Sequence, residues 1–219
     1  MKKGICYIFG AGDYYGPLPY PAKEDFVIAV DGGFEHLKAQ NIAPNLVIGD
    51  FDSLQEPVSA LDTNVVVLPQ EKDDTDMMAA LQSGQSRGYR TFHIYGGTGG
   101  RLDHTLANIQ CLAYLNRMGS QGLLFDRDTV ITVISNGRMS FPAKARGLLS
   151  IFALTDVASG VCESGLKYSL HDAMLQNMYP LGISNEFTGQ PSELSVKEGA
   201  LIVIYPQDIA PVIVERADR

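Results

Sequence analysis

The sequence predicts an α/β protein: an N-terminal open, mainly parallel wound α/β domain followed by a small C-terminal all-β sandwich domain. Over residues 1–135, short apolar runs alternate with helix-like stretches. Near-continuous apolarity of such runs is typical of strands buried on both faces of a parallel sheet. After Asn136-Gly137 the pattern changes to short strand-like segments separated by Gly, Pro, Ser or Asn, which is typical of a small β domain. We therefore expect two domains, 1–137 and 138–219.

The elements expected in the first domain follow in chain order. Strands are predicted at 5–9, 26–30, 46–48, 65–68, 92–95, 123–125 and 130–134. Helices are predicted at 33–41, 75–87 and 103–118. The last of these helices has Leu102, Leu106, Ile109 and Ala113 on one stripe, with spacings of three and four. The alternation of strands and helices predicts a wound sheet with helices on its faces.

The second domain reads as strands with few helices. Strands are predicted at 138–141, 147–154, 161–168, 182–188, 193–197 and 200–205, and residues 171–178 are a candidate for a short helix.

Composition excludes several classes of partner. The 219 residues carry a net charge of −8 with a pI of about 4.9 and no Lys/Arg cluster, which argues against nucleic acid and anionic membranes. No apolar run approaches the roughly 20 residues of a membrane span, and Gly10 and Asp13 interrupt the first apolar stretch too early for a signal peptide. Cys6, Cys111 and Cys162 form no CxxC pair, which favours a reducing compartment. We expect a cytoplasmic protein.

Polar clusters directly follow four of the predicted strands. Residues 1–135 hold 16 acidic against 10 basic residues, and many of the aspartates stand in these clusters. The clusters are Asp31-Gly32-Gly33, Gly49-Asp50-Phe51-Asp52-Ser53, Lys72-Asp73-Asp74-Thr75-Asp76 and Gly96-Gly97-Thr98-Gly99-Gly100-Arg101-Leu102-Asp103-His104. Because the carboxyl ends of parallel strands line one edge of a sheet, we expect all four clusters to meet at one crevice.

Such a crevice would need a cation. Two carboxylates about 5 Å apart repel by roughly 3 kcal/mol at an effective dielectric of 20. Oxygen ligands from aspartate, without a Cys or His cluster, favour Mg²⁺, which readily shares its shell with phosphate oxygens. The acids therefore indicate a phosphorylated substrate.

Each acid also has a purely structural interpretation. Asp74 or Thr75 would N-cap the helix that follows, and for Asp74 this is the preferred reading. Asp103 and His104 could begin the next helix. Asp50 and Asp52, and likewise Asp31, could be turn formers. The coincidence of acids at four successive strand ends favours the functional interpretation.

The glycine loop predicts the phosphate side of the site. Four glycines within 96–100 allow backbone N–H groups to approach an anion, Arg101 offers a forked donor, and a helix N-terminus follows. A Gly-rich turn without a ligand is the alternative.

Gly10-Ala11-Gly12 imitates a dinucleotide fingerprint, but its third glycine, Gly16, comes one place late and is followed by three prolines. We therefore do not expect nicotinamide binding.

Taken in order, these motifs resemble the thiamin pyrophosphokinase family. The likeness spans nearly the whole chain. In the first domain it rests on the four clusters above, together with Pro44 and the run Thr105-Leu106-Ala107-Asn108. In the second domain it rests on Gly165-Leu166-Lys167-Tyr168 and Gly182-Ile183-Ser184-Asn185-Glu186.

The resemblance implies a reaction and a set of site residues. The β,γ-diphosphoryl unit of ATP would move to the hydroxyl of thiamin, giving thiamin diphosphate and AMP, in a homodimer with shared active sites. Mg²⁺ and the phosphates would be held by Asp50, Asp52 and Asp76 with Asp73, and Asp103 would lie beside them. Asp31, Lys72, Gly99, Gly100, Arg101 and His104 would lie near the triphosphate of ATP, and Tyr168, Ser184 and Asn185 near thiamin.

The chemistry implied is an in-line displacement aided by positioning and charge neutralisation. Asp103 or Asp73 is the candidate acceptor of the hydroxyl proton. The family often has Trp where this chain has Tyr168, and the chain contains no Trp. A tyrosine ring can still stack on a thiazolium cation, although it is a weaker cation–π partner than indole.

Two other functions compete with this interpretation. A metal-dependent nucleotide-sugar glycosyltransferase would use Asp50-Phe51-Asp52 to hold a metal and a diphosphate, but it leaves Arg101-Leu102-Asp103-His104 without a role. A non-catalytic nucleotide sensor would keep the glycine loop and could dispense with several acids, all of which are present here.

Overall fold

The computed structural model describes residues 2–49, 64–67, 74–209 and 213–216 of the chain. The chain divides into two compact units, Met1–Arg127 and Asp128–Arg219. The first is an open parallel α/β domain and the second is all-β, so the predicted fold class is confirmed. The boundary expected at 137/138 lies inside strand β7 (Thr129–Phe141), and the strand expected at 130–134 is part of that longer strand.

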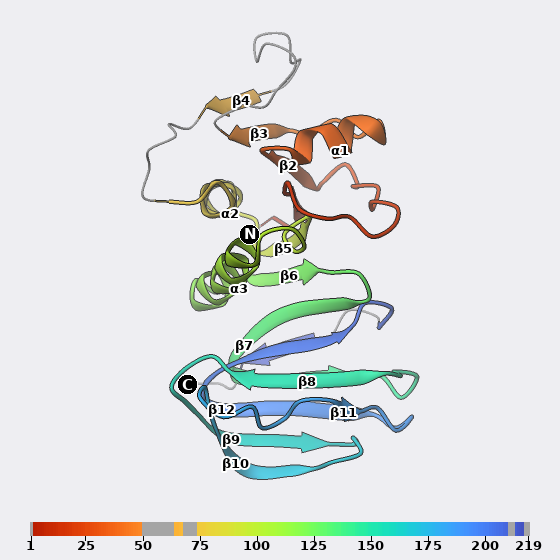
Figure 1. Ribbon diagram of the computed structural model, residues 1–219, viewed down its shortest axis with the longest axis vertical. Helices are drawn as coiled ribbons and strands as arrows, with labels where there is room; N and C mark the ends of the chain where they lie inside the picture. Colours follow the sequence, from red (N-terminus) through yellow and green to blue (C-terminus); the bar gives the residue numbers. More distant parts are fainter. Residues whose placement is uncertain (1, 50–63, 68–73, 210–212, 217–219) are drawn as a thin grey trace. The chain divides into compact units, whose positions relative to one another are not determined.

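The first unit is built on six parallel strands in the order β4-β3-β2-β1-β5-β6 (Figure 1). The strands are β1 (Ile5–Phe9), β2 (Phe26–Val30), β3 (Leu46–Gly49), β4 (Asn64–Val67), β5 (Thr91–Tyr95) and β6 (Gln121–Phe125). The helices are α1 (Gly33–Ala39), α2 (Asp76–Ser86) and α3 (Leu102–Arg117). Each predicted strand and helix of this unit is present within a few residues of its expected bounds.

Helices cover the two faces of this sheet because side chains alternate along each strand. Leu37 of α1 packs in a core cluster with Phe9 and Val47. On the other face, α2 and α3 pack closely against the strands. A Cβ on Gly84 of α2 would press against Phe92 and the Sγ of Cys6, and a Cβ on Gly122 of β6 would meet leucines of α3. In β1, β2 and β3 nearly every residue is buried, which explains why these strands are continuously apolar in the sequence.

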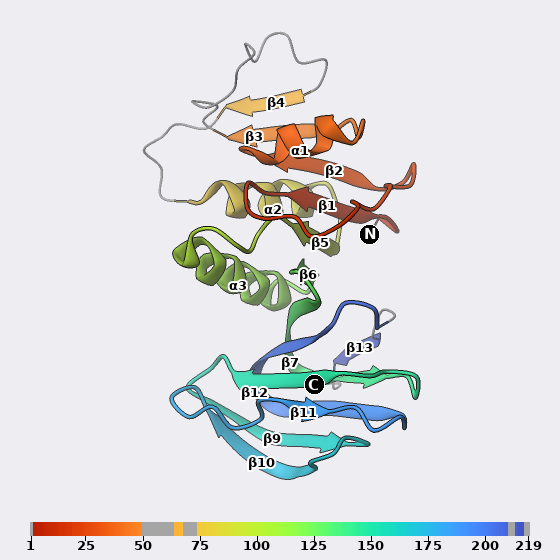
Figure 2. The same ribbon diagram turned by 45° about the vertical axis from the view of Figure 1, so that its right-hand side comes forward.

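The second unit is organised around two long antiparallel strands. Its strands are β7 (Thr129–Phe141), β8 (Leu148–Ala153), β9 (Val157–Ser164), β10 (Leu170–Gln176), β11 (Asn185–Glu186), β12 (Ser192–Pro206) and β13 (Ile213–Arg216). β12 pairs with β7 along most of its length, with β9 through its first half and with β8 through its second half. The three remaining strands each add one antiparallel pair: β10 pairs with β9, β11 with β8, and β13 with β7 (Figure 2).

The long strands change partners at a bulge. The register of β12 against β7 shifts between Val196 and Ala200, where Gly199 adopts a φ of +94°. On β7, Asn136 adopts a φ of +46° in the same region. Bulges of this kind bend and twist a strand, so each long strand can serve two different sets of neighbours.

Two expectations for the second unit are wrong. Residues 171–178 do not form a short helix: 170–176 form strand β10, whose backbone pairs with β9 through an irregular register. Partner hydrogen bonds outweigh the weak local pattern there. The strands expected at 193–197 and 200–205 are one strand, because the intervening Gly199 marks a bulge and not a loop. The structure contains, over the residues it describes, no helix with the length and apolarity needed to span a membrane.

Candidate functional site

The loop that follows β1 is hydrogen-bonded to the glycine loop, residues 96–100. The backbone N–H groups of Gly12 and Asp13 donate to the carbonyl oxygens of Gly96 and Thr98, at 2.8 and 2.9 Å. These bonds extend the pairing of β1 and β5 beyond the strand ends. A Cβ on Gly12 would lie 2.7 Å from the oxygen of Gly96, so the close approach requires glycine. The Gly10-Ala11-Gly12 segment, which imitates a dinucleotide motif, therefore supports the glycine loop at residues 96–100.

The glycine loop is held in place on several sides. The buried Thr98 hydroxyl donates to the carboxylate of Asp126 at 2.8 Å, and the amide of Asn108 donates to the carbonyl of Gly97 at 2.7 Å. A Cβ on Gly99, which has a φ of +77°, would collide with the carboxylate of Asp13. One on Gly100, with a φ of +58°, would meet no described atom within 4 Å. Residues 97–99 of the loop are thus held by neighbouring groups, whereas the space beside Gly100 is open.

Arg101 and Asp103 form an ion pair at the start of α3. Nε and Nη2 of Arg101 donate to the two carboxylate oxygens of Asp103 at 3.1 and 2.5 Å, and both side chains are well exposed. The hydrogen bond from Arg101 lowers the pKa of Asp103, and the backbone N–H of His104 adds a bond of 3.1 Å. Asp103 and His104 stand in the first turn of the helix, as the structural interpretation expected.

The start of α2 is capped by Thr75. Its side chain accepts from the backbone N–H of Met78 at 3.2 Å. Of the two predicted cap residues, Thr75 is therefore confirmed, and the preference for Asp74 is wrong. Asp76 is the first residue of the helix, where the helix dipole favours a carboxylate.

Asp31 lies at the carboxyl end of β2. It adopts a φ of +49°, and its backbone N–H donates to the carbonyl of Ile48 at 2.9 Å. A Cβ on Gly49 would collide with its carboxylate oxygen, so this side chain lies against the residue that precedes Asp50.

Four of the predicted site residues lie outside the described residues: Asp50, Asp52, Lys72 and Asp73. Among the described residues, no group of three or more His, Cys, Asp or Glu side chains is arranged to hold a metal ion. The described part therefore supplies Asp31 and Asp76 to this edge of the sheet, and metal binding stays a prediction that depends on Asp50 and Asp52.

Sequence reasoning missed Asp13 and Tyr14. The hydroxyl of Tyr14 donates to the carbonyl of Gly10 at 2.6 Å, and its ring lies against Gly96 and stacks on His36 with 4.1 Å between centroids. The signal in the sequence is their position directly after Gly10-Ala11-Gly12, which carries no motif beyond the glycines.

In the second unit, the two segments of the family resemblance lie side by side. Leu166 and Phe187 form an antiparallel bridge, and the backbone N–H of Lys167 donates to the carbonyl of Glu186 at 2.9 Å. The side chains of Lys167 and Glu186 also pair at 2.9 Å. The structure thus joins Gly165–Tyr168 to Ser184–Glu186 in one local cluster.

Asn185 is the centre of this cluster. Its Oδ1 accepts from the backbone N–H groups of Tyr168 and Glu186, both at 3.0 Å. Its Nδ2 donates to the carbonyl of Tyr168 at 2.8 Å and to Oε2 of Glu163 at 3.1 Å. Both N–H donors of the buried amide and both lone pairs of its oxygen are therefore used within the chain. The backbone N–H and carbonyl of Tyr168 are both hydrogen-bonded to Asn185, while the residue as a whole is 62% exposed.

Ser184 and Glu163 flank this centre. Ser184 is exposed, has a φ of +58°, and donates its backbone N–H to the hydroxyl of Ser150 at 2.9 Å. Glu163 is buried, and sequence reasoning did not single it out. An isolated acid at a strand position gives no signal of its own, since its importance lies in the contact with Asn185.

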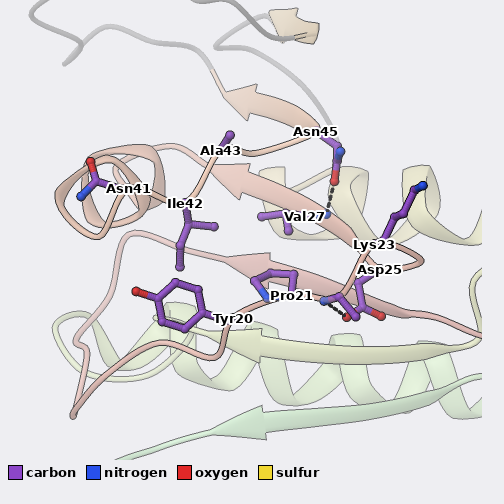
Figure 3. Close-up of a pocket in the computed structure, with 10 residues that line it drawn as sticks. Tyr20, Pro21, Lys23, Asp25, Val27, Asn41, Ile42, Ala43 and Asn45 are labelled. Atoms are coloured by element: carbon purple, nitrogen blue, oxygen red, sulfur yellow. Dashed lines mark hydrogen bonds between the residues drawn. The ribbon is translucent and has the colours of Figure 1, made fainter.

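A pocket of about 330 Å³ lies elsewhere, at the amino ends of β2 and β3 (Figure 3). The carboxylate of Asp25 accepts from the backbone N–H groups of Ile5 and Ala22, and Asn45 accepts from that of Val27. These polar groups hold the fold together at the edge opposite to the glycine loop, so we do not place the site there.

Comparison with known proteins identifies both units. The family model described as thiamin pyrophosphokinase, catalytic domain, matches residues 19–121, and that described as thiamin pyrophosphokinase, vitamin B1 binding domain, matches residues 140–201. The chain belongs to the thiamin pyrophosphokinase family. Members of this family are enzymes, as predicted for this chain.

Relatives of the family support the assignment over most of the chain. The thiamine pyrophosphokinase of Bacillus subtilis is 28% identical over 194 residues, which cover 86% of this chain and 91% of that protein. Thiamin pyrophosphokinase 1 of Caenorhabditis elegans is 24% identical over 196 residues, covering 83% and 78%. The crystal structure of the Bacillus subtilis enzyme matches with a TM-score of 0.82, covering 93% of this chain and 99% of that one. The glycosyltransferase alternative finds no support in these matches.

Proposed function

We propose that this protein transfers the β,γ-diphosphoryl group of ATP to the hydroxyl of thiamin, releasing thiamin diphosphate and AMP. The observation that carries the proposal is the match of both units to the two domains of one enzyme family. The braced glycine loop and the Asn185-centred cluster give each unit a preformed element that suits its substrate. Under this proposal, the first unit, Met1–Arg127, binds ATP and the second unit, Asp128–Arg219, binds thiamin.

On the ATP side, the glycine loop and α3 would receive the phosphates. Gly99 and Gly100 have positive φ values, which turns the backbone of an open loop toward the helix start. Arg101 offers a forked donor, and its present partner is Asp103. Because that pair is exposed, its exchange for a phosphate contact has a small energetic cost. His104 follows in the same helical turn.

The donor chemistry at this edge suits Mg²⁺. The described contributors, Asp31 and Asp76, offer carboxylate oxygens, which are the ligands Mg²⁺ prefers. We propose that Asp76 joins Asp50 and Asp52 in holding the ion, with Asp31 nearby. When bound, Mg²⁺ would neutralise charge on the transferring phosphoryl groups.

The chain's own residues would then orient the displacement. Lys72 and Arg101 would supply positive charge to the phosphates, which is the main requirement of phosphoryl transfer. Asp103 or Asp73 would accept the proton of the thiamin hydroxyl, Asp103 once Arg101 has exchanged it for a phosphate.

On the thiamin side, Tyr168 is the proposed stacking partner. Its exposed ring is held at a fixed backbone position and can face the thiazolium cation. Asn185 would act on the substrate indirectly, because its amide is already saturated by contacts within the chain. Ser184 is exposed, and we propose that it contacts the substrate directly.

The proposal extends to the protein's surroundings. We propose a cytoplasmic homodimer with shared active sites and no nucleic-acid or membrane partner. The net charge of −8 argues against polyanionic partners. Several large apolar side chains of the second unit are exposed, which is typical of interfaces: Tyr168, Met174, Met178, Tyr179, Leu181 and Ile183.

Product analysis tests the proposed reaction. The protein is incubated with ATP, Mg²⁺ and thiamin, and nucleotides and thiamin phosphates are separated by chromatography. AMP and thiamin diphosphate in equal amounts are expected. ADP with thiamin monophosphate, or no thiamin-dependent loss of ATP, would contradict diphosphoryl transfer.

A further inference from the structure

Glu163 is a buried acid in an apolar setting. It stands on β9 between β10 and β12, with Leu170 and Leu194 opposite it in the two registers. Its side chain is 1% exposed, and that of Leu194 is 0% exposed. A carboxyl group at such a position has a high desolvation cost, so its retention needs a compensating contact.

That contact is the amide of Asn185. Oε2 of Glu163 accepts from Nδ2 of Asn185 at 3.1 Å, while Oε1 is buried without a hydrogen-bond partner among the described atoms. The orientation of the amide is determined independently, because the backbone N–H groups of Tyr168 and Glu186 both require the oxygen of Asn185 on their side. Its NH₂ group must therefore point toward Glu163 and toward the carbonyl of Tyr168.

The carboxyl group changes its charge near neutral pH. Burial raises the pKa of Glu163 to about 7, against a smaller opposite effect of the Asn185 hydrogen bond. The charged or titratable side chains on the neighbouring elements are exposed or half-exposed: Lys167, His171, Asp172, Glu186, Glu193, Lys197 and Glu198. Four of these seven are paired with one another, Lys167 with Glu186 and Lys197 with Asp172. The apolar surroundings therefore dominate the behaviour of Glu163.

We propose that Glu163 is a positioning residue for the thiamin site: its carboxyl group holds the amide of Asn185, and through that amide the backbone of Tyr168, in the arrangement that receives the acceptor. This inference rests on the proposed function, because it assumes that the Tyr168 segment binds thiamin. Glu163 itself would not touch the substrate, because the residue is only 1% exposed.

The proposed role of Glu163 makes the KM for thiamin depend on pH. A carboxylate accepts a hydrogen bond about twice as strong as a neutral acid does. The ionised form of Glu163 therefore holds Asn185 more firmly, and the KM for thiamin falls as pH rises through 7. We expect the KM for ATP to be unaffected by the ionisation of Glu163, because Glu163 lies in the second unit and the glycine loop lies in the first.

Steady-state kinetics of three variants tests this inference. Glu163→Gln keeps an acceptor for Asn185 but removes the titration, Glu163→Leu removes the acceptor at similar volume, and Glu198→Gln makes the same chemical change at an exposed glutamate. KM and kcat for thiamin and for ATP are measured between pH 6 and 8.5, with circular dichroism to verify folding. In the wild type we expect a several-fold fall in the KM for thiamin across that range, on the order of the change in hydrogen-bond strength.

The outcomes separate the two proposals. Glu163→Leu should raise the KM for thiamin about tenfold, with the KM for ATP unchanged, as the loss of one charge-assisted hydrogen bond predicts. Glu163→Gln should abolish the pH dependence, and Glu198→Gln should behave as wild type. If Glu163→Leu does not fold, the pH profile of Glu163→Gln decides. Wild-type turnover with an unaltered KM in Glu163→Leu, or a wild-type profile in Glu163→Gln, overturns the role of Glu163. A wild-type protein that makes no thiamin diphosphate overturns the proposed function, and this inference with it.

Discussion

The buried carboxyl group of Glu163 makes the stability of the second unit depend on pH, whatever the substrate. In the unfolded chain this group has an ordinary pKa of 4.5, whereas in the folded protein burial raises its pKa to about 7. Replacing it by Gln keeps the shape and the hydrogen bond to Asn185 and removes the ionisation. The variant therefore isolates the energetic effect of one buried charge.

The sign follows from proton linkage. Below pH 4.5 the group is protonated in both states and its contribution to stability is fully present. Between pH 4.5 and 7 the unfolded chain loses its proton while the folded protein keeps it, so the free energy of unfolding falls with rising pH. A difference of about 2.5 pKa units at about 1.4 kcal/mol each corresponds to a loss of about 3 kcal/mol above pH 7.

Urea unfolding at several pH values measures this loss. Because the chain contains no Trp, unfolding is followed by far-ultraviolet circular dichroism and tyrosine fluorescence. Hydrogen bonds from Lys197 and Arg101 lower the pKa values of Asp172 and Asp103, and these acids titrate in the opposite sense at lower pH. Comparison of wild type with Glu163→Gln at each pH cancels such common contributions.

The variant should gain about 3 kcal/mol relative to wild type between pH 4.5 and pH 8. Glu198→Gln, at an exposed position, should show no such trend. A difference between Glu163→Gln and wild type that stays constant over this range would refute the reasoning, because it would mean that the carboxyl group titrates normally in the folded protein.

Three further predictions concern other positions. Tyr168→Ala should raise the KM for thiamin with little change in the melting temperature, because the residue is 62% exposed; an unchanged KM would show that the ring does not stack on the substrate. Asp52→Asn should remove most turnover while circular dichroism stays that of the folded protein, since the carboxylate is assigned to the metal; near-normal turnover would exclude it as a ligand. Thr75→Ala should cost about 1 kcal/mol in unfolding free energy through loss of the α2 cap, whereas Thr75→Ser should retain it; equal stability of the two variants would argue against the cap.

Elements with strong local signals were predicted well from the sequence. Strands β1, β2 and β3 are continuous apolar runs because nearly all their residues are buried. Helix α3 is present as predicted, but the stripe of Leu102, Leu106, Ile109 and Ala113 is not its buried face: Leu102 and Leu106 are exposed, and the helix buries Cys111, Leu112 and Leu115 instead. The local pattern offers 171–178 only as a candidate for a short helix, because the strand conformation of β10 depends on pairing with β9, which lies outside any local window. The division of β12 at Gly199 was misread for the same reason, since only the register against β7 distinguishes a bulge from a loop.

The candidate site shows a similar contrast. Arg101 and Asp103 were recognised by residue type, but their pairing with each other requires the geometry of the α3 start. Asp13 and Glu163 carry no motif of their own. Their roles come from neighbours 86 positions away at Gly99 and 22 positions away at Asn185, as the bond between Glu163 and Asn185 illustrates.

The sequence by itself determined the fold class, the two-domain order and the family, because these depend on hydrophobic periodicity and on short motifs whose residues are contiguous. Only the tertiary structure decided which side chains are already occupied. Asn185 was expected to meet the substrate, yet its amide is saturated by Tyr168, Glu186 and Glu163. Hydrogen bonding and desolvation act between residues that the chain brings together from distant positions, so the charge state of Glu163 and the availability of Asn185 follow from packing and not from residue type.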